Sequence, residues 1–290
     1  MLIRSKLLLS AAVSVTAVIA MFGLQLYTNS VESELSHAAQ NVLELERDVL
    51  LLRKNEKDFF GRKDIQYVEK HKQVHASIDD MIPKLEKIFK KYDVPITSLE
   101  SFDRNLNQYQ QAFNEVVQLQ QEIGLTPKTG LYGTLRTAVH NVESMLKEYD
   151  QLSLQVAMLQ LRRNEKDFML RREMSYVETF DANIALFNSS LRASSLDIDA
   201  QNKIVALIEQ YQKDFKSLVS KEQQLGLDEK QGTMAQLIAA NKLTESSADE
   251  LHNLALKAID ETDNSSRNIG IAVFLIIALI LGIITYLIIR

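Results

Sequence analysis

The sequence predicts an all-α protein, and three observations lead to this prediction. The 290 residues include only 9 glycines and 3 prolines, whereas average shares are about 7% and 5%. So few turn-forming residues exclude the many chain reversals of a β-sandwich, a β-barrel or an α/β sheet. A long uncharged stretch lies near each end, and a long internal repeat lies between them. The chain is therefore expected to consist of a few long helices.

The two uncharged stretches are Leu7–Leu26 and Ile269–Ile289. About twenty apolar residues cross the hydrocarbon core of a bilayer as a helix. The first stretch is longer than the apolar part of a signal peptide, so we interpret it as a retained span. Basic residues at both chain ends (Arg4, Lys6 and Arg290) place those ends in the cytoplasm by the positive-inside rule. The expected topology is a cytoplasmic segment 1–6, a span 7–28, a periplasmic domain 29–268 and a span 269–289 in the bacterial inner membrane.

Composition excludes several functions. The chain has no cysteine, which removes disulfides, thiolate catalysis and cysteine-bound metals. The net charge is −5, so nucleic acid is not expected as a partner. The sequence also contains no Ser–His–Asp set, phosphate loop or carboxylate pair with supporting context. We therefore expect neither an enzyme nor a cofactor.

The strongest internal signal is a duplication. Leu52–His71 matches Leu161–Phe180 at an offset of 109 residues, with Arg, Asn-Glu-Lys-Asp-Phe and Tyr-Val-Glu in register. Tyr109–Gly130 matches Tyr211–Gly232 at an offset of 102 residues. Two blocks that recur in the same order indicate two copies of one structural unit.

The rare turn signals divide the external segment into helices. Gly124 and Gly226 each predict a tight hairpin after a helix. Further turns are expected near residues 92–97, 147–153 and 194–199. The resulting helices are about 30–92, 98–123, 127–147, 153–193, 199–225 and 229–268. These six helices are expected to form two stacked four-helix bundles that share the two long helices 30–92 and 153–193. The distal bundle would take residues 60–172, and the proximal bundle residues 29–60 plus 172–268.

The doubled Arg-x-Asn-Glu-Lys-Asp-Phe…Tyr-Val-Glu block, placed between two spans, resembles the helical bimodular sensor domain of bacterial chemoreceptors (methyl-accepting chemotaxis proteins). The same domain occurs in some sensor histidine kinases. The resemblance covers residues 29–268. It implies a periplasmic homodimer that binds small carboxylic acids, such as citric-acid-cycle intermediates and acetate. It also implies a HAMP linker and a cytoplasmic signalling module, which would begin about where Arg290 stands and are absent from this chain.

The repeated block places a carboxylate on each apolar seam. A carboxylate that faces a core must be paired, and an arginine lies three residues before each one, on the same helix face. A structural interpretation is a polar layer that fixes helix register at the bundle junction, formed by Glu56, Glu165, Phe59 and Phe168. A functional interpretation is a clamp for a ligand carboxylate, formed by Arg53, Arg162 and Arg163. Because the block is nearly identical in both copies, the structural interpretation is favoured.

The two copies differ at His71 and His75, where copy two has Phe180 and Ile184. Arg136 and His140 come from a helix of the same expected bundle. Three interpretations stay open: satisfied polar residues of the core, a small-anion pocket formed with Arg136, and a zinc site with His140. The first is favoured, so no metal is expected. Lys63 is expected to be ordinary surface.

These expectations favour the sensing and membrane-anchoring part of a chemoreceptor for small organic acids. The first alternative is the input domain of a sensor histidine kinase, with a periplasmic binding protein as a possible ligand. The second is a structural two-span coiled-coil protein without a ligand.

Overall fold

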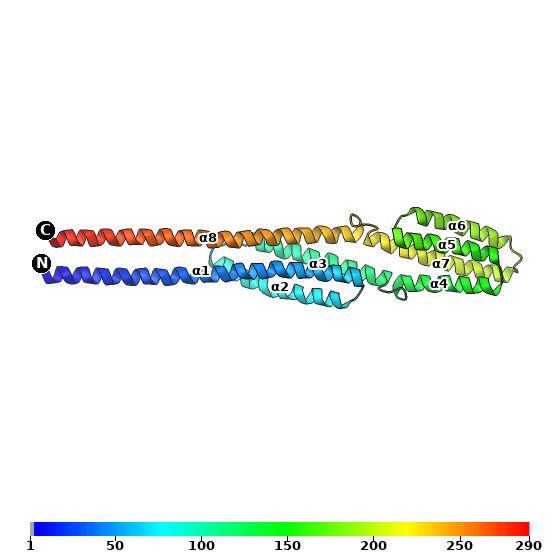
Figure 1. Ribbon diagram of the computed structural model, residues 1–290, viewed down its shortest axis with the longest axis horizontal. Coiled ribbons are helices and arrows are strands. Elements are labelled where there is room, and N and C mark those ends of the chain that lie inside the picture. Colours follow the sequence, from blue (N-terminus) through cyan, green and yellow to red (C-terminus); the bar gives the residue numbers. More distant parts are fainter. Residues whose placement is uncertain (1–2, 290) are drawn as a thin grey trace. The chain divides into compact units, whose positions relative to one another are not determined.

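The computed structural model describes residues 3–289, which form eight α-helices and no strand (Figure 1). The helices are α1 (Ile3–Arg62), α2 (Gln66–Lys91), α3 (Thr97–Ile123), α4 (Gly130–Glu148), α5 (Leu152–Arg171), α6 (Ser175–Arg192), α7 (Ile198–Leu225) and α8 (Gly232–Ile289). The prediction of an all-α fold is confirmed. The expected set of six external helices is not found, because each of the two long helices is broken.

The predicted helix 30–92 is wrong, because the chain reverses between α1 and α2 (Figure 1). The predicted helix 153–193 is wrong for the same reason, because the chain reverses between α5 and α6. At each reversal a basic residue takes the left-handed conformation, Lys63 with φ 52° and Arg172 with φ 57°. Their backbone N–H groups donate to the carbonyls of Phe59 and Phe168, both at 2.7 Å. These two breaks occupy equivalent positions in the repeat.

The predicted glycine hairpins are confirmed. Gly124 and Gly226 follow α3 and α7 with φ values of 127° and 118°, a region that side chains rarely adopt. A Cβ atom would lie 2.3 Å from the Thr129 carbonyl oxygen at Gly124, and 2.2 Å from the Gln231 carbonyl oxygen at Gly226. Only glycine fits these two turns without a backbone shift.

The chain forms two compact units, which do not follow the expected boundary near residue 172. The first unit consists of the described parts of residues 1–52, 73–105 and 244–290. The second unit consists of residues 53–72 and 106–243. Residues 172–243 thus belong with residues 106–171, and helices α1, α2, α3 and α8 each contribute to both units.

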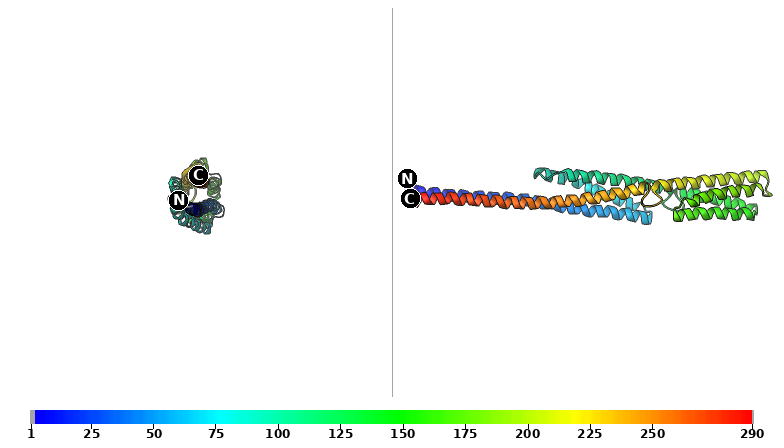
Figure 2. Two further views of the ribbon diagram at one scale, coloured as in Figure 1. Left: turned by 90° about the vertical axis from the view of Figure 1, so that its left-hand side faces the viewer. Right: turned by 90° about the horizontal axis from the view of Figure 1, so that it is seen from above.

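The first unit packs parts of α1, α2, α3 and α8 around an apolar seam. The apolar residues of α1 at helical spacing are buried in this unit, as that spacing would place them on one face; they are Leu35, Val42, Leu45, Val49 and Leu52. Polar contacts link the helices pairwise. Lys91 of α2 pairs with Glu34 of α1 at 2.7 Å, and His252 of α8 lies 3.4 Å from Glu46 of α1. Figure 1 shows α1 and α8 running side by side, and the view from above in Figure 2 shows them following the same line.

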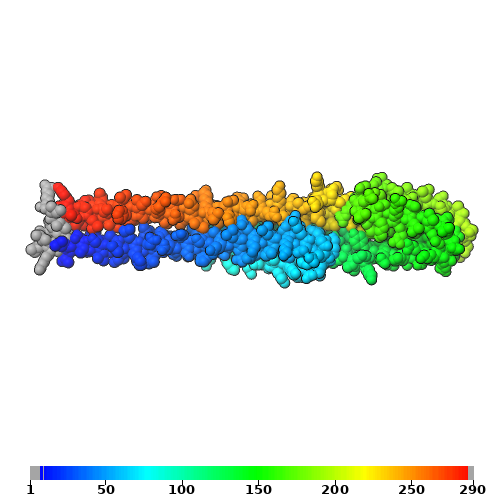
Figure 3. Space-filling view, in the orientation of Figure 1, coloured from blue at the N-terminus to red at the C-terminus, as the bar shows by residue number. Residues whose placement is uncertain are grey.

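Helices α1 and α8 are long and apolar enough to cross a membrane. Their most apolar windows have mean hydropathies of 1.6 and 2.8, and neither window is buried inside the protein. In the space-filling view these segments lie against each other, and no other helix covers them on the visible face (Figure 3). The two-pass character expected from the sequence is therefore supported by length, composition and exposure.

The second unit contains a four-helix bundle of α4–α7, in which α4 and α6 each pack against both α5 and α7. The parts of α1, α2 and α3 in this unit contribute further aromatic side chains. Its fully buried residues include Phe59, Phe113, Phe168, Phe180 and Phe215. Burial of an aromatic side chain contributes on the order of 1.5–3 kcal/mol, so this aromatic core positions the polar groups described next.

Candidate functional site

Two buried carboxylates from the repeated block each accept a hydrogen bond from a buried tyrosine. Tyr109 donates to Glu56 Oε2 at 2.7 Å, and Tyr211 donates to Glu165 Oε2 at 2.8 Å. The second oxygen of Glu56 pairs with Arg53, and that of Glu165 pairs with Lys166 at 2.7 Å. Both carboxylates are therefore satisfied, as a buried charge requires.

Aromatic contacts surround each Glu–Tyr pair in the same pattern. Phe59 meets Phe113 edge-on at 6.0 Å between centroids, and Phe168 meets Phe215 at 5.7 Å. The favourable edge-to-face geometry is thus present in both copies. The predicted junction residues Glu56, Glu165, Phe59 and Phe168 are all buried, and all belong to the second unit.

The two helix reversals bring equivalent basic residues next to equivalent polar partners. Lys63 donates to the amide oxygen of Gln120. Arg172 pairs with Glu222 Oε2 at 3.0 Å and donates to the carbonyl of Gly226 at 3.3 Å. Gln120 and Glu222 stand 102 residues apart, so they are equivalent in the repeat. Copy one therefore has a neutral acceptor where copy two has a carboxylate.

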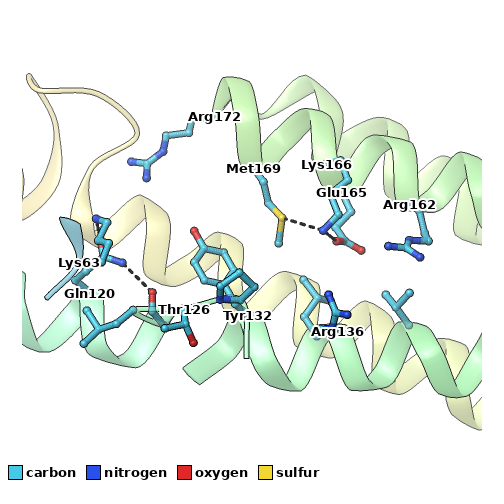
Figure 4. Close-up of a pocket in the computed structure, with 15 residues that line it drawn as sticks. Lys63, Gln120, Thr126, Tyr132, Arg136, Arg162, Glu165, Lys166, Met169 and Arg172 are labelled. Atoms are coloured by element: carbon cyan, nitrogen blue, oxygen red, sulfur yellow. Dashed lines mark hydrogen bonds and ion pairs between the residues drawn. The ribbon is translucent and has the colours of Figure 1, made fainter. Parts of the chain in front are cut away.

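A cavity of about 320 Å³ lies within the second unit, beside these reversals (Figure 4). Lys63 and Arg172 lie toward one end of it, and Arg136 and Arg162 lie toward the other. Its lining residues are Lys63, Gln120, Gly124, Leu125, Thr126, Pro127, Tyr132, Leu135, Arg136, Val139, Arg162, Glu165, Lys166, Met169 and Arg172. Five side chains in this lining are basic and one is acidic, so the cavity is cationic.

The charges around the cavity are only partly neutralised. Burial, together with repulsion from Arg172, lowers the pKa of Lys63 below its ordinary value, although Glu222 opposes this change. Arg136 forms no ion pair with any residue in the described range 3–289. Arg162 pairs with Glu143 of α4. An anion in the cavity would therefore meet cations that the protein itself does not fully compensate.

Tyr132 closes one side of the cavity. Its hydroxyl donates to Glu222 Oε1 at 2.9 Å. Burial and the charge of Glu222 raise the pKa of Tyr132 well above its ordinary value, so the phenol stays protonated. Glu222 thus accepts from Tyr132 through one oxygen and pairs with Arg172 through the other.

The predicted clamp of three arginines is not assembled around this cavity. Arg162 lines the cavity, but Arg53 does not line it and pairs with Glu56. The Arg163 side chain is 76% exposed and lies 3.8 Å from Asp167. Among the six predicted ligand-binding residues, Arg136 and Arg162 are the two that line the cavity.

The predicted histidines also lie outside the cavity lining. His71 is buried, stacks on Phe113 at 4.0 Å between centroids and has Nε2 3.4 Å from the Tyr109 hydroxyl. His75 has Nδ1 2.9 Å from Asp79 Oδ2. One ring nitrogen of each histidine thus lies near a polar side chain, whereas His75 Nε2 is buried without a hydrogen-bond partner among the described residues. The interpretation as satisfied polar residues of the core stays a prediction.

The zinc alternative finds no support in the described residues. His140, the third ligand of that alternative, has Nδ1 3.2 Å from Glu143 Oε2. Across the described part of the chain, no three His, Asp or Glu side chains converge as metal ligands would.

Sequence reasoning missed six polar residues of this lining: Lys63, Gln120, Thr126, Tyr132, Lys166 and Arg172. The expectation that Lys63 is ordinary surface is wrong, because its side chain is half-buried and lines the cavity. A signal was available in the repeat, because Lys63 and Arg172 are equivalent basic residues directly after the Asn-Glu-Lys-Asp-Phe blocks.

Comparison of the chain with protein-family models, curated proteins and solved structures finds no match. The resemblance to the chemoreceptor sensor domain thus rests on the repeated block and the two apolar stretches alone.

Proposed function

We propose that this chain is the sensing and membrane-anchoring part of a bacterial chemotaxis receptor. Residues 29–268 would lie in the periplasm and bind a small organic acid, and the two spans would anchor them in the inner membrane. The cavity of the second unit is the proposed ligand site. Neither catalysis nor a cofactor is part of this proposal.

The observation that supports the proposal most strongly is the charge of the cavity. Five basic side chains and one carboxylate line it, and Lys63 is held there with a lowered pKa against a neutral amide. Arginine and lysine are the side chains that recognise carboxylates by charge-assisted hydrogen bonds. A volume of about 320 Å³ lies at the lower end of the range of small-molecule sites.

The contacts of Arg172 offer a route from this cavity to the membrane. Arg172 donates to the carbonyl of Gly226, in the turn that precedes α8. Helix α8 then runs without a break from Gly232 to Ile289. An anion that draws Arg172 toward the cavity would release this turn, and a shift of α8 by an ångström or two is the kind of displacement that switching proteins use.

A ligand screen on the full-length chain in detergent tests this proposal. The chain is heated with acetate, succinate, malate or citrate, and its melting temperature is recorded. We expect at least one acid to raise the melting temperature, because a ligand that binds only the folded state stabilises it. Calorimetry then compares Arg136→Gln with Arg163→Gln, since Arg136 lines the cavity and Arg163 does not.

The proposal requires that Arg136→Gln weaken binding and that Arg163→Gln leave it unchanged. Equal affinities of the two variants would move the ligand site away from this cavity. The absence of any stabilising acid, in a chain that remains folded, would favour the structural two-span alternative.

A homodimer is part of the proposed receptor. Leu43 and Leu50, two turns apart on α1, are 49% and 63% exposed. Exposed apolar positions at this spacing are suited to packing against a second helix.

The alternative function, the input domain of a sensor histidine kinase, has support from a different surface. Leu170 on α5 has a side chain that is 80% exposed, and we propose it as a contact for such a protein partner. A pull-down with periplasmic binding proteins, comparing the original chain with Leu170→Ser, would distinguish this alternative from direct binding of an acid.

A further inference from the structure

A second cavity, of about 490 Å³, lies in the first unit beside the end of the first expected span and the start of the second. The turn between α2 and α3 forms one wall, with Tyr92 and Pro95, and the other walls come from α1 and α8. On the α1 side the lining reaches Leu24, inside the uncharged stretch. On the α8 side it reaches Ile269, the first residue of the second stretch.

This position corresponds to the headgroup layer of a bilayer. The lining on α1 runs from Leu24 to Val31, and the uncharged stretch ends at Leu26. Val31 is five residues beyond Leu26, which amounts to about 7 Å at 1.5 Å per residue. The headgroup region on each side of a bilayer is roughly 5–8 Å thick. The α1 side of the cavity therefore spans the headgroup layer, whereas its α8 side extends further from the membrane, to Leu254, fifteen residues before Ile269.

The lining of this cavity is amphipathic and carries charges of both signs. Lys91 and Lys257 supply cations, and Asp93 and Glu261 supply carboxylates. Lys91 keeps its charge firmly, because hydrogen bonds to Glu34 and Tyr92 raise its pKa to about 12. A zwitterionic phospholipid headgroup has a phosphate for Lys91 and an ammonium group for Asp93, the two charged lining residues at the α2–α3 turn. Its acyl chains fit the apolar side of the cavity.

Tyr92 adds an aromatic side chain of the type found at membrane interfaces. It lies in the turn after α2, and its ring is 4.9 Å from Lys91 Nζ. Tyr27 lies in the same lining, at the end of the first uncharged stretch. Tyrosine is enriched at both membrane–water interfaces because its ring is apolar and its hydroxyl is polar. The turn between α2 and α3 thus carries the side chains that a membrane-contacting turn needs.

We propose that the α2–α3 turn is seated in the headgroup layer and that the cavity beside it holds a zwitterionic aminophospholipid. This inference rests on the proposed two-span anchoring of the chain. It gives the sensing unit a second contact with the membrane, separate from the two spans, on a helical hairpin that packs on α1 and α8.

The chain contains no tryptophan, so a single introduced tryptophan reports its own surroundings. Full-length Tyr92→Trp is reconstituted into vesicles of phosphatidylethanolamine, with and without bromine near the top of the acyl chains. Tyr27→Trp is the positive control at the end of the first span. Tyr149→Trp, in the turn between α4 and α5 of the second unit, is the control outside the first unit. Far-ultraviolet circular dichroism checks that each variant is folded.

We expect brominated lipid to quench Tyr92→Trp and Tyr27→Trp. Adding Lys91→Gln to Tyr92→Trp should reduce the quenching, because the cation for the phosphate is lost. An unquenched Tyr92→Trp beside a quenched Tyr27→Trp would overturn the inference and leave the spans intact. An unquenched Tyr27→Trp would instead refute the two-span proposal itself. If soluble glycerophosphoethanolamine shifts the Tyr92→Trp emission and brominated lipid does not quench it, the cavity binds a free headgroup compound and the membrane inference fails.

Discussion

The buried hydrogen bond between Tyr211 and Glu165 gives the most direct test of how the repeated block stabilises the protein. Tyr211 is fully buried, and its hydroxyl donates to Glu165 Oε2 at 2.8 Å. Burial, and then the charge of Glu165, raise the pKa of Tyr211 well above its ordinary value. The phenol is therefore a hydrogen-bond donor at every pH at which the protein would be studied. Tyr211→Phe removes this donor and keeps the ring, including its edge-on contact with Phe180 at 5.2 Å.

The expected loss follows from the charge of the acceptor. A hydrogen bond to a charged group contributes about 1.5–3 kcal/mol. Glu165 keeps its contact with Lys166 through the other oxygen, so the carboxylate is not left without any partner. We expect Tyr211→Phe to lower the free energy of unfolding by about 1.5–3 kcal/mol. At about 2–4 °C per kcal/mol for a domain of roughly 150–250 residues, the melting temperature should fall by roughly 3–12 °C.

Thermal unfolding of the full-length chain in detergent, followed by circular dichroism, measures this change. Tyr176→Phe is the matched control, because the Tyr176 hydroxyl makes no hydrogen bond within the described residues and its side chain is only half-buried. Tyr109→Phe should behave like Tyr211→Phe, since Tyr109 makes the equivalent bond to Glu56. If Tyr211→Phe unfolds at the same temperature as Tyr176→Phe, the buried carboxylate does not depend on the tyrosine and the structural interpretation of the block is refuted.

Three further predictions concern the cavity and the turns. Lys63 must be protonated to bind an anion and its pKa is below the ordinary 10.5, so carboxylate affinity should fall as pH rises through that lowered pKa. The Lys63→Arg variant should keep its affinity for the carboxylate as pH rises, because the guanidinium stays charged. Calorimetry across pH measures both affinities, and a wild-type affinity that stays constant up to pH 10.5 would contradict the prediction. Gln120→Glu should weaken carboxylate binding in the same assay, because the new carboxylate would pair with Lys63 and neutralise it. Unchanged binding would show that Lys63 does not contact the ligand. Gly226→Ala should cost about 1–3 kcal/mol from its positive φ alone, whereas Gly61→Ala, which has open space around it, should not destabilise; similar melting temperatures for the two variants would show that the turn tolerates a side chain.

Sequence reasoning predicted those parts of the fold that depend on strong local signals. The hairpins after Gly124 and Gly226 were predictable because glycine is rare in this chain and only glycine fits their backbone conformation. The buried face of α1 was predictable from helical periodicity. The uncharged stretches predicted two helices able to cross a membrane, because twenty apolar residues leave few other options.

The reversals at Lys63 and Arg172 were not predictable from turn chemistry. Each places a long basic side chain in the left-handed region, which costs a residue other than glycine roughly 1–2 kcal/mol. That cost is offset by tertiary contacts that the local sequence does not contain. Lys63 reaches Gln120, and Arg172 reaches Glu222 and Gly226. Neither left-handed position is a glycine, although Gly61 lies two residues before Lys63 in copy one.

The same long-range contacts explain why the candidate site was only partly predicted. Arg136 and Arg162 were singled out as cations near the core, and both line the cavity. Lys63 was dismissed because it lies among surface charges in the sequence, and only the reversal after α1 turns it inward. Arg53 was chosen for its spacing from Glu56, but that spacing pairs the two residues with each other.

The difference between the two copies gives the cavity its unbalanced charge. In copy two, Arg172 meets the carboxylate of Glu222 and is neutralised within the protein. In copy one, Lys63 donates to the neutral amide of Gln120. If both Lys63 and Arg172 were paired with a carboxylate of the protein, the two turns would form a polar layer with no net charge to attract an anion. Because the acceptor in copy one is an amide, Lys63 keeps a positive charge that faces the cavity. The ion pair between Arg172 and Glu222 in copy two stabilises the fold. The single difference between Gln120 and Glu222 can thus give one copy a role in stability and the other a role in ligand recognition.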